Sequence, residues 1–221
     1  EFAKKGGKIS ADSIDNSGGV QTSDYEVNLK IILNSLINKS IITQDRKLEI
    51  LKALASDVES IVLTTNYDQA LSLSLDGIRS RGYTERIKES LSVLEEGVDS
   101  FRREHFDIPG AEEFERAFDS DGRVLRPMLS VMLSFSKIFL NSFLLKEREF
   151  LASEFTMRYL YAYFPSTFVA LYRVEVENHP LKGEIIATYI SNKIINAKGS
   201  TFIYDFKRLN RDEFLLRIKS F

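Results

Sequence analysis

The sequence predicts a mainly α-helical protein, built as a helical bundle domain that follows a short remnant of an α/β domain. After residue 23, apolar residues recur almost continuously at steps of three and four, the spacing of one helix face. Prolines are few, and Pro165 and Pro180 fall between apolar-periodic segments rather than inside them. Residues 8–10 are the one stretch read as a short strand, leading into a glycine-containing loop.

The first predicted helix covers residues 24–37. Ser23 and Glu26 form an S-x-x-E capping box ahead of its apolar positions, which places Ser23 at the helix N-cap. Thr43 is the predicted N-cap of the next helix. Residues 61–78 form a further helix that ends near Gly82. These assignments predict three successive helices before residue 83.

The clearest amphipathic stripe follows Thr84, the predicted start of another helix. Its apolar positions are Ile87, Leu91, Leu94, Val98 and Phe101. A loop over 105–111 then contains Pro109-Gly110, and His105 lies in it as an exposed side chain. A short helix over 112–118 completes this part of the chain.

Pro127 suits the first turn of an apolar helix that extends to about Leu145. Residues 128–145 approach the length of a membrane span, but Lys137 and Asn141 interrupt them, so we expect a buried core helix. Aromatic residues between 159 and 172 predict an aromatic core. Gly199 ends a helix, and residues 201–204 form an extended piece. The remaining helices are predicted over 148–163, 166–176, 181–197 and 211–219.

Composition narrows the functional classes. Hydrophobic residues make up 43% of the 221 residues and charged residues 28%, as in ordinary globular proteins. The formal net charge of −2 offers no basic excess, so we expect no nucleic-acid partner. The sequence has no cysteine and two histidines, which leaves no Cys- or His-rich metal site. We expect no membrane partner, no signal peptide and a cytoplasmic location.

The stretch over residues 15–28 carries the most chemical information. Asn16 has an amide that donates and accepts, which suits either a nicotinamide carboxamide or a turn that bonds its own backbone. Gly18 and Gly19 permit close approach of the backbone to a ligand, or simply a tight turn. Ser23 offers its hydroxyl either to a substrate carboxylate or to the helix cap. Spacing alone leaves each of these alternatives open.

This stretch resembles the Asn-Ala-Gly-Gly-Val-x-x-Ser-x-x-Glu segment of glutamate dehydrogenases, with Ser17 in place of the alanine. The whole chain is similar to the C-terminal portion of the large bacterial NAD-specific members. Further matching stretches occur in the same order at residues 6–9, 22–30, 66–69, 125–127, 136–138 and 179–188.

The resemblance implies oxidative deamination of L-glutamate to 2-oxoglutarate and ammonia, with hydride transfer to NAD. It implies that Asn16, Gly18 and Gly19 bind the cofactor and that Ser23 binds the substrate. No catalytic residue is assigned within this chain, because the family's catalytic lysine, aspartate and dinucleotide glycines lie upstream, so the chain alone is expected to be inactive.

The resemblance also divides the chain. Residues 1–30 are expected to be the end of a Rossmann-type, cofactor-binding catalytic domain, and residues 31–221 an all-helical C-terminal domain. A homo-oligomer is expected. The alternative hypothesis is a helical interaction or oligomerisation module without catalytic chemistry, and a Gly-rich βαβ unit upstream would decide between the two.

Overall fold

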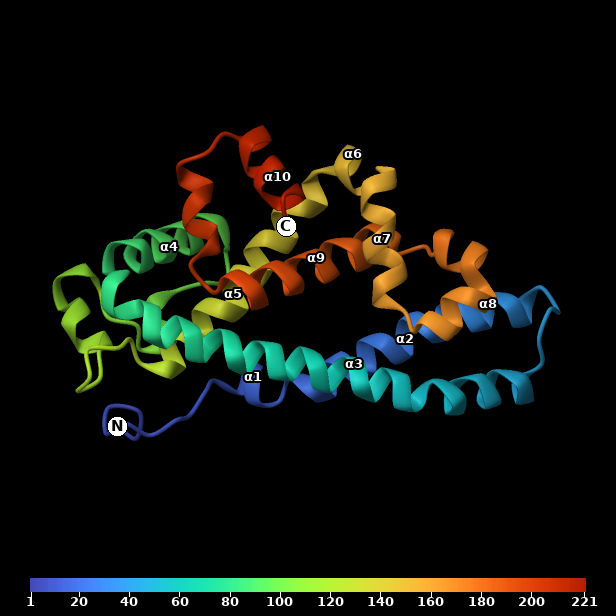
Figure 1. Cartoon of the computed structure of the whole chain (residues 1–221), viewed down its shortest axis with the longest axis horizontal. Coiled ribbons are helices and arrows are strands. Elements are labelled where there is room, and N and C mark those ends of the chain that lie inside the picture. The colour runs from blue at the N-terminus through green and yellow to red at the C-terminus, as the bar shows by residue number, and fades with distance from the viewer. The chain divides into compact units, whose positions relative to one another are not determined.

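The computed structural model describes the backbone of residues 1–221 and every side chain except that of Ala111. It is mainly α-helical, which confirms the predicted class (Figure 1). Extended pairing among the described residues amounts to one antiparallel bridge between Phe118 and Val124. The α-helices are α1 (Asp12–Asp15), α2 (Ser17–Asn38), α3 (Gln44–Arg79), α4 (Thr84–Gly97), α5 (Arg126–Lys146), α6 (Arg148–Leu151), α7 (Glu154–Tyr163), α8 (Ser166–Glu177), α9 (Lys182–Lys198) and α10 (Arg211–Lys219). The 3₁₀ helices are η1 (Ser80–Gly82), η2 (Arg103–Phe106), η3 (Ala111–Ala117) and η4 (Phe202–Lys207).

The chain divides into two compact units. Unit 1 contains Glu1–Asp15, Asp68–Phe143 and Ser191–Phe221, and unit 2 contains Asn16–Tyr67 and Leu144–Ile190. Each unit therefore combines segments that are distant in the sequence, and each has its own buried core.

The core of unit 1 is built on α4 and on the unit's part of α5. Three positions of the predicted stripe, Ile87, Leu91 and Leu94, lie in α4 and are buried at 0–1% exposure. The other two, Val98 and Phe101, are also buried but lie beyond the end of the helix at Gly97.

Among the described residues, α5 is the one helix long and apolar enough to cross a membrane by length and composition. Its side chains at Met132, Leu133 and Leu140 are fully buried within the protein. This burial fits the core helix that the sequence predicts.

Gly199 ends α9 with a φ of +92°, as predicted for a helix-stopping glycine. The next residue, Ser200, donates hydrogen bonds from its backbone N and its Oγ to the buried Oδ2 of Asp76, at 2.7 and 2.8 Å. Ser136 of α5 donates to the carbonyl oxygen of Ser200 at 2.7 Å. The end of α9 is thus fixed to α3 and α5 by buried polar contacts.

The core of unit 2 is partly aromatic. Tyr25 of α2 stacks on Tyr163 of α7 with ring centroids 4.5 Å apart. Tyr163, Phe164 and Phe168 are buried, which confirms the predicted aromatic core. Leu33 of α2 is completely buried in the same unit.

The start of α2 corrects the first prediction. The helix begins at Ser17 rather than at residue 24, so Ser23 lies inside it and cannot be its N-cap. Gly18 and Gly19 are helical residues of the first turn, and neither has a positive φ. Glu26 forms an ion pair with Lys30 instead of closing a capping box. The glycine pair is therefore part of the helix and not a loop before it.

Four other parts of the chain differ from the predicted secondary structure. The two helices expected over 43–78 are one continuous α3, although its N-cap is correct: the backbone N of Arg46 donates to Thr43 Oγ1 at 3.2 Å. Residues 8–10 form no strand, because the described part of the chain supplies no neighbouring strand for them. The helix expected over 148–163 is broken at residues 152–153 into α6 and α7. Residues 202–207 form η4 instead of an extended piece, because Phe202 and Ile203 are buried in the core of unit 1.

Candidate functional site

The candidate site is the N-terminal end of α2, in unit 2. Asn16 occupies the N-cap position with φ −106° and ψ 15°, and its side chain makes no capping hydrogen bond. Gly18 and Gly19 are the second and third helical residues, and Ser23 lies one turn further on. The backbone N–H groups of a helix's first turn have no partners within the helix and carry partial positive charge. The acidic helix α1 ends at Asp15, directly before Asn16, so what this end of α2 offers a ligand is its exposed side chains and the backbone at Gly19.

Three of the four predicted site residues share one exposed face. Successive residues of an α-helix are rotated by about 100°, so positions 16, 19 and 23 lie within about 60° of one another. Asn16, Gly19 and Ser23 are all exposed. Val20 and Val27 on the same face are 73% and 53% exposed. This exposed stripe presents an amide, a bare backbone segment and a hydroxyl beside two uncovered valines.

Gly18 lies on the other side of α2, against α3. A Cβ atom at this position would be 3.0 Å from Nδ2 of Asn66. The Oδ1 of Asn66 accepts a hydrogen bond from Ser17 Oγ at 2.6 Å, and Gln21 Nε2 approaches it at 3.4 Å. Close packing of α2 on α3 therefore accounts for a glycine at residue 18.

A partly buried polar network lies beside the stripe and begins at Asp24, one residue past Ser23. Tyr163 donates to Asp24 Oδ2 at 2.7 Å, and Asn28 Nδ2 donates to the Tyr163 hydroxyl at 2.9 Å. The ring of His179 contacts the carbonyl oxygen of Asn28 through Nε2 at 3.2 Å. Burial raises the pKa of Tyr163 and lowers the pKa of His179, so both side chains are neutral at pH 7.

This network was not predicted as a unit. His179 and Tyr163 are distant from α2 in sequence, and only the aromatic core was expected there. A cavity of about 120 Å³ beside the network is lined by Asp24, Asn28 and residues of α9. The neutral tyrosine and histidine fix the orientation of α2, which in turn fixes the direction of the exposed stripe.

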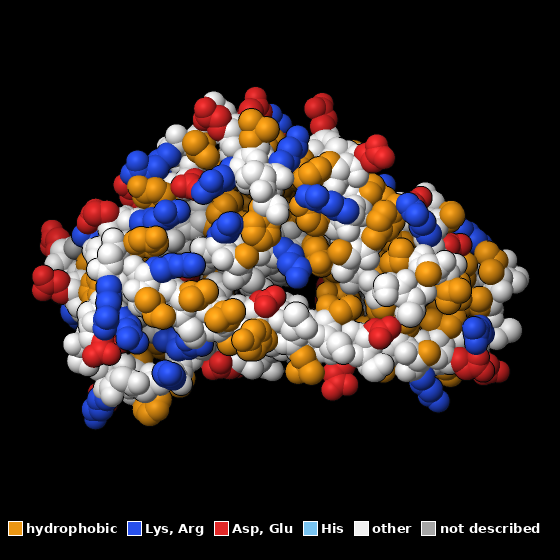
Figure 2. Space-filling model, viewed as in Figure 1, with side chains coloured by type: hydrophobic (Ala, Val, Ile, Leu, Met, Phe, Trp, Pro, Cys, Tyr) orange, Lys and Arg blue, Asp and Glu red, His pale blue; other side chains and the backbone are white. Residues whose placement is uncertain are grey.

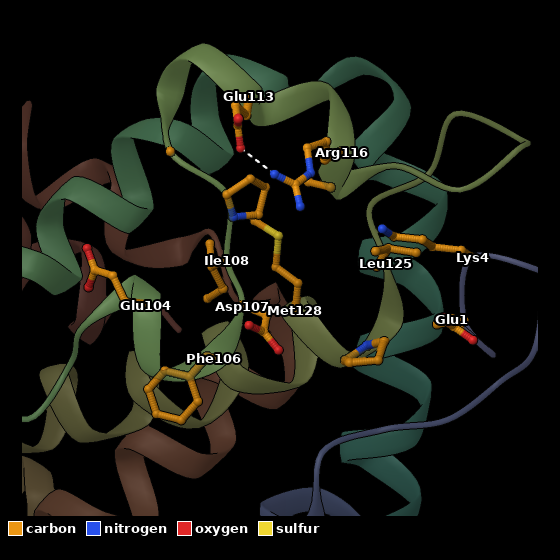
Figure 3. Close-up of a pocket in the computed structure, with 15 residues that line it drawn as sticks. Glu1, Lys4, Glu104, Phe106, Asp107, Ile108, Glu113, Arg116, Leu125 and Met128 are labelled. Atoms are coloured by element: carbon orange, nitrogen blue, oxygen red, sulfur yellow. Dashed lines mark hydrogen bonds and ion pairs between the residues drawn. The ribbon is translucent and has the colours of Figure 1, made fainter.

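Unit 1 contains a separate and larger cavity of about 680 Å³, shown in Figure 3. Glu104, Asp107, Ile108 and Met128 contribute to its lining, and Arg116 forms an ion pair with Glu113 on its wall. The walls mix acidic, basic and apolar side chains, and the residues predicted as site residues do not line it. Across the described residues, no group of three or more His, Asp or Glu side chains is arranged to hold a metal ion.

Lys137 is a further titratable group that the sequence did not single out for chemistry. It lies on α5, where its Nζ donates to Oε1 of Gln69 at 2.7 Å. Burial lowers the pKa of Lys137 to about 7. Gln69 and Lys137 come from two stretches that carry part of the sequence resemblance, 66–69 and 136–138, and the fold of unit 1 brings these two residues together.

Comparison with known proteins gives two family matches, separated by residues 77–121. Residues 1–76 match the family model "Bacterial NAD-glutamate dehydrogenase, catalytic domain", and residues 122–210 match "Glutamate dehydrogenase, C-terminal". The two models follow each other along the chain without overlap. The chain belongs to the bacterial NAD-specific glutamate dehydrogenase family.

Curated NAD-specific glutamate dehydrogenases match almost the whole chain. The protein of Halomonas elongata is 33% identical over 209 residues, which cover 92% of this chain and 12% of the relative. The protein of Pseudomonas aeruginosa is 33% identical over 207 residues, 94% of this chain and 13% of the relative. The protein of Mycobacterium tuberculosis is 28% identical over 211 residues, 92% of this chain and 12% of the relative. The chain thus spans about an eighth of the length of these glutamate dehydrogenases.

The catalytic-domain match of the glutamate dehydrogenase family includes the whole exposed stripe of α2. It ends at residue 76, within α3, whereas the sequence-based boundary lies at residue 30. The division into 1–30 and 31–221 stays a prediction, as do the ligand roles of Asn16, Gly18, Gly19 and Ser23.

Proposed function

We propose that this chain is part of an NAD-dependent glutamate dehydrogenase that oxidatively deaminates L-glutamate to 2-oxoglutarate and ammonia. The relatives that match nearly the full length of the chain are named NAD-specific glutamate dehydrogenases. NAD, when bound, accepts the hydride from the substrate. The catalytic groups belong to parts of the protein outside this chain.

In this proposal the N-terminal end of α2 contributes to the site without carrying out the chemistry. Asn16 holds the nicotinamide amide group, and the exposed backbone at Gly19 lets the cofactor approach closely. Ser23 donates a hydrogen bond to a carboxylate of glutamate. The observation that carries the proposal is the exposed stripe: Asn16, Gly19 and Ser23 lie exposed on one face of a single helix.

The exposed valines support this reading. Val20 and Val27 flank Ser23 on the same face, and their exposure is expected of a surface that a catalytic domain or its ligands cover in the intact protein. Gly18 contributes to the site indirectly: because it has no Cβ, α2 can lie close to α3, and this packing orients the exposed face of α2.

The test is the variant Ser23→Ala in the intact enzyme. Ser23 is exposed inside α2 and does not cap it, so its loss should change the free energy of unfolding by less than about 0.5 kcal/mol. Loss of a hydrogen bond to a charged carboxylate should raise KM for glutamate by about tenfold or more. Steady-state kinetics with glutamate varied at saturating NAD measure this change.

Ser35→Ala is the matched control, because Ser35 is also exposed on α2 but lies two turns beyond the valines. Equal KM values for Ser23→Ala, Ser35→Ala and the parent enzyme would remove the substrate role of Ser23. The proposal also includes a homo-oligomer and a cytoplasmic location. Sedimentation of the intact protein tests the oligomer, and cell fractionation tests the location.

A further inference from the structure

A second cavity of unit 1, of about 260 Å³, is lined by small, apolar and charged residues, among which the basic side chains outnumber the acidic ones. It lies between the N-terminal segment, the C-terminal part of α3 and the loop that leads into α5. Gly6, Gly7 and Gly77 contribute backbone without side chains to its walls. Figure 2 shows Lys and Arg side chains gathered at the lower left of the visible face, where Figure 1 places the N-terminal end of the chain and the end of α3.

Arg126 brings to this cavity a positive charge that no ion pair within the described residues neutralises. Its guanidinium donates to Ser10 Oγ at 3.1 Å and to Ser74 Oγ at 3.2 Å, and it approaches the carbonyl oxygen of Ala70 at 3.4 Å. All three acceptors are neutral. Arg126 is only half-buried, and within the described residues it forms no ion pair. Its hydrogen bonds hold the guanidinium in place while leaving its charge available.

Arg123 adds an unsatisfied donor. Its Nε is buried and has no hydrogen-bond partner among the described residues. The rest of its guanidinium also makes no hydrogen bond within the described residues, and Arg123 lines the cavity, so its terminal N–H groups can donate to a ligand there. Arg123 also forms no ion pair within the described part of the chain. Two guanidinium groups of one cavity therefore lack an acidic partner.

Two acids, Asp119 and Asp121, also line the cavity and offset part of this positive charge, but neither forms an ion pair with Arg123 or Arg126 within the described residues. Asp119 uses its Oδ1 to accept the backbone N–H groups of Asp121 and Arg123, both at 2.9 Å. Lys8 is an additional exposed cation of the lining, which then holds three basic and two acidic side chains. The first turn of α5, which begins at Arg126, adds the partial positive charge of a helix N-terminus.

We propose that this cavity binds a small oxyanion, whose carboxylate or phosphate oxygens accept hydrogen bonds from Arg123 and Arg126. Guanidinium groups match the planar oxygen pairs of carboxylate and phosphate. A cavity of about 260 Å³ is smaller than a typical site for a drug-sized ligand, so the anion is a small one. All the residues named belong to unit 1, whereas the proposed NAD and glutamate contacts belong to unit 2.

The test is calorimetric titration of the intact protein with inorganic phosphate and, separately, with malonate, at constant ionic strength set by NaCl. Arg123→Gln and Arg126→Gln each remove one guanidinium and should weaken binding by about tenfold or more. Arg116→Gln is the matched control, because Arg116 is an exposed arginine of unit 1 that does not line this cavity. The preferred probe distinguishes a phosphate ligand from a carboxylate ligand.

Saturable binding that weakens in both cavity variants and persists in Arg116→Gln supports the proposal. Arg126→Gln also removes hydrogen bonds to Ser10 and Ser74, so this variant can fold less stably for a reason unrelated to binding. If Arg126→Gln has a folding defect, Arg123→Gln is the deciding variant, because the Arg123 side chain makes no hydrogen bond within the described residues. Binding that is unchanged in Arg123→Gln belongs to another site and overturns the proposal. No binding of either probe beyond the NaCl baseline overturns it as well.

Discussion

Gly199, which ends α9, is the position where one added methyl group should cost the most stability. Its φ of +92° lies in a region that L-residues rarely adopt. A Cβ atom there would be 2.1 Å from Oδ1 of Asp76. The Asp76 carboxylate cannot move away freely, because it accepts two hydrogen bonds from Ser200 at 2.7 and 2.8 Å in a buried site.

The expected cost of Gly199→Ala has two parts. The left-handed backbone conformation costs an L-residue about 1–2 kcal/mol. Displacing a buried carboxylate from its donors costs about 2–3 kcal/mol more, since hydrogen bonds to charged groups are worth about 1.5–3 kcal/mol. The free energy of unfolding should therefore fall by about 3–5 kcal/mol, measured by urea denaturation of the purified protein.

Gly122→Ala separates the two parts. Gly122 also has a positive φ, of +71°, but a Cβ atom there would meet nothing within 4 Å. Its substitution should cost only about 1–2 kcal/mol. In a background of Asp76→Ala, the cost of Gly199→Ala should fall to the same value, because the clashing oxygen is gone. Equal costs for the two glycine variants, or an unchanged cost in that background, would refute the reasoning.

Two further predictions concern α2 and α5. Gly18→Ala should lower the free energy of unfolding by about 1 kcal/mol, because the added Cβ would press on Asn66. Gly19→Ala should instead raise the free energy of unfolding by up to about 1 kcal/mol, because alanine favours the helix. Urea denaturation measures both changes, and a change of the same sign in both variants would contradict the packing of α2 on α3. Burial lowers the pKa of Lys137 from 10.5 to about 7, so between these values the folded protein binds fewer protons than the unfolded chain and stability rises with pH. The contribution of Lys137 is up to about 1.4 kcal/mol per pH unit, and Lys137→Met should remove it. Urea denaturation of both proteins at about pH 7.5 and 9 measures this difference, and parallel pH dependences would show that Lys137 is not the group responsible.

The helix class and most helix positions follow from local pattern, because apolar spacing and caps act over a few residues. Thr43 caps α3 as predicted, and the predicted apolar stripe from Ile87 to Phe101 is buried. The start of α2 does not follow from local pattern. Two neighbouring glycines are typical of a loop, but here they belong to a helix that packs on Asn66, far along the chain.

The buried polar contacts could not be predicted from sequence patterns either. The bonds between Asp76 and Ser200 span more than a hundred residues, as do those between Tyr163 and Asp24. No periodicity links such residues, because they meet only when separate helices pack. The predicted site residues lie close together in sequence, so their neighbourhood was predictable, whereas their direction depends on these distant contacts.

The error at the start of α2 strengthens the case for the proposed site. A loop before residue 24 would leave the Asn16 amide and the Ser23 hydroxyl free to point in unrelated directions. A helix from Ser17 onward fixes their relation instead, since seven residues are nearly two full turns and return to almost the same face. Release of Ser23 from the capping role also frees its hydroxyl for a ligand. A ligand that spans the two side chains must therefore lie along the axis of α2, with its amide end near Asn16 and its carboxylate about two turns further on.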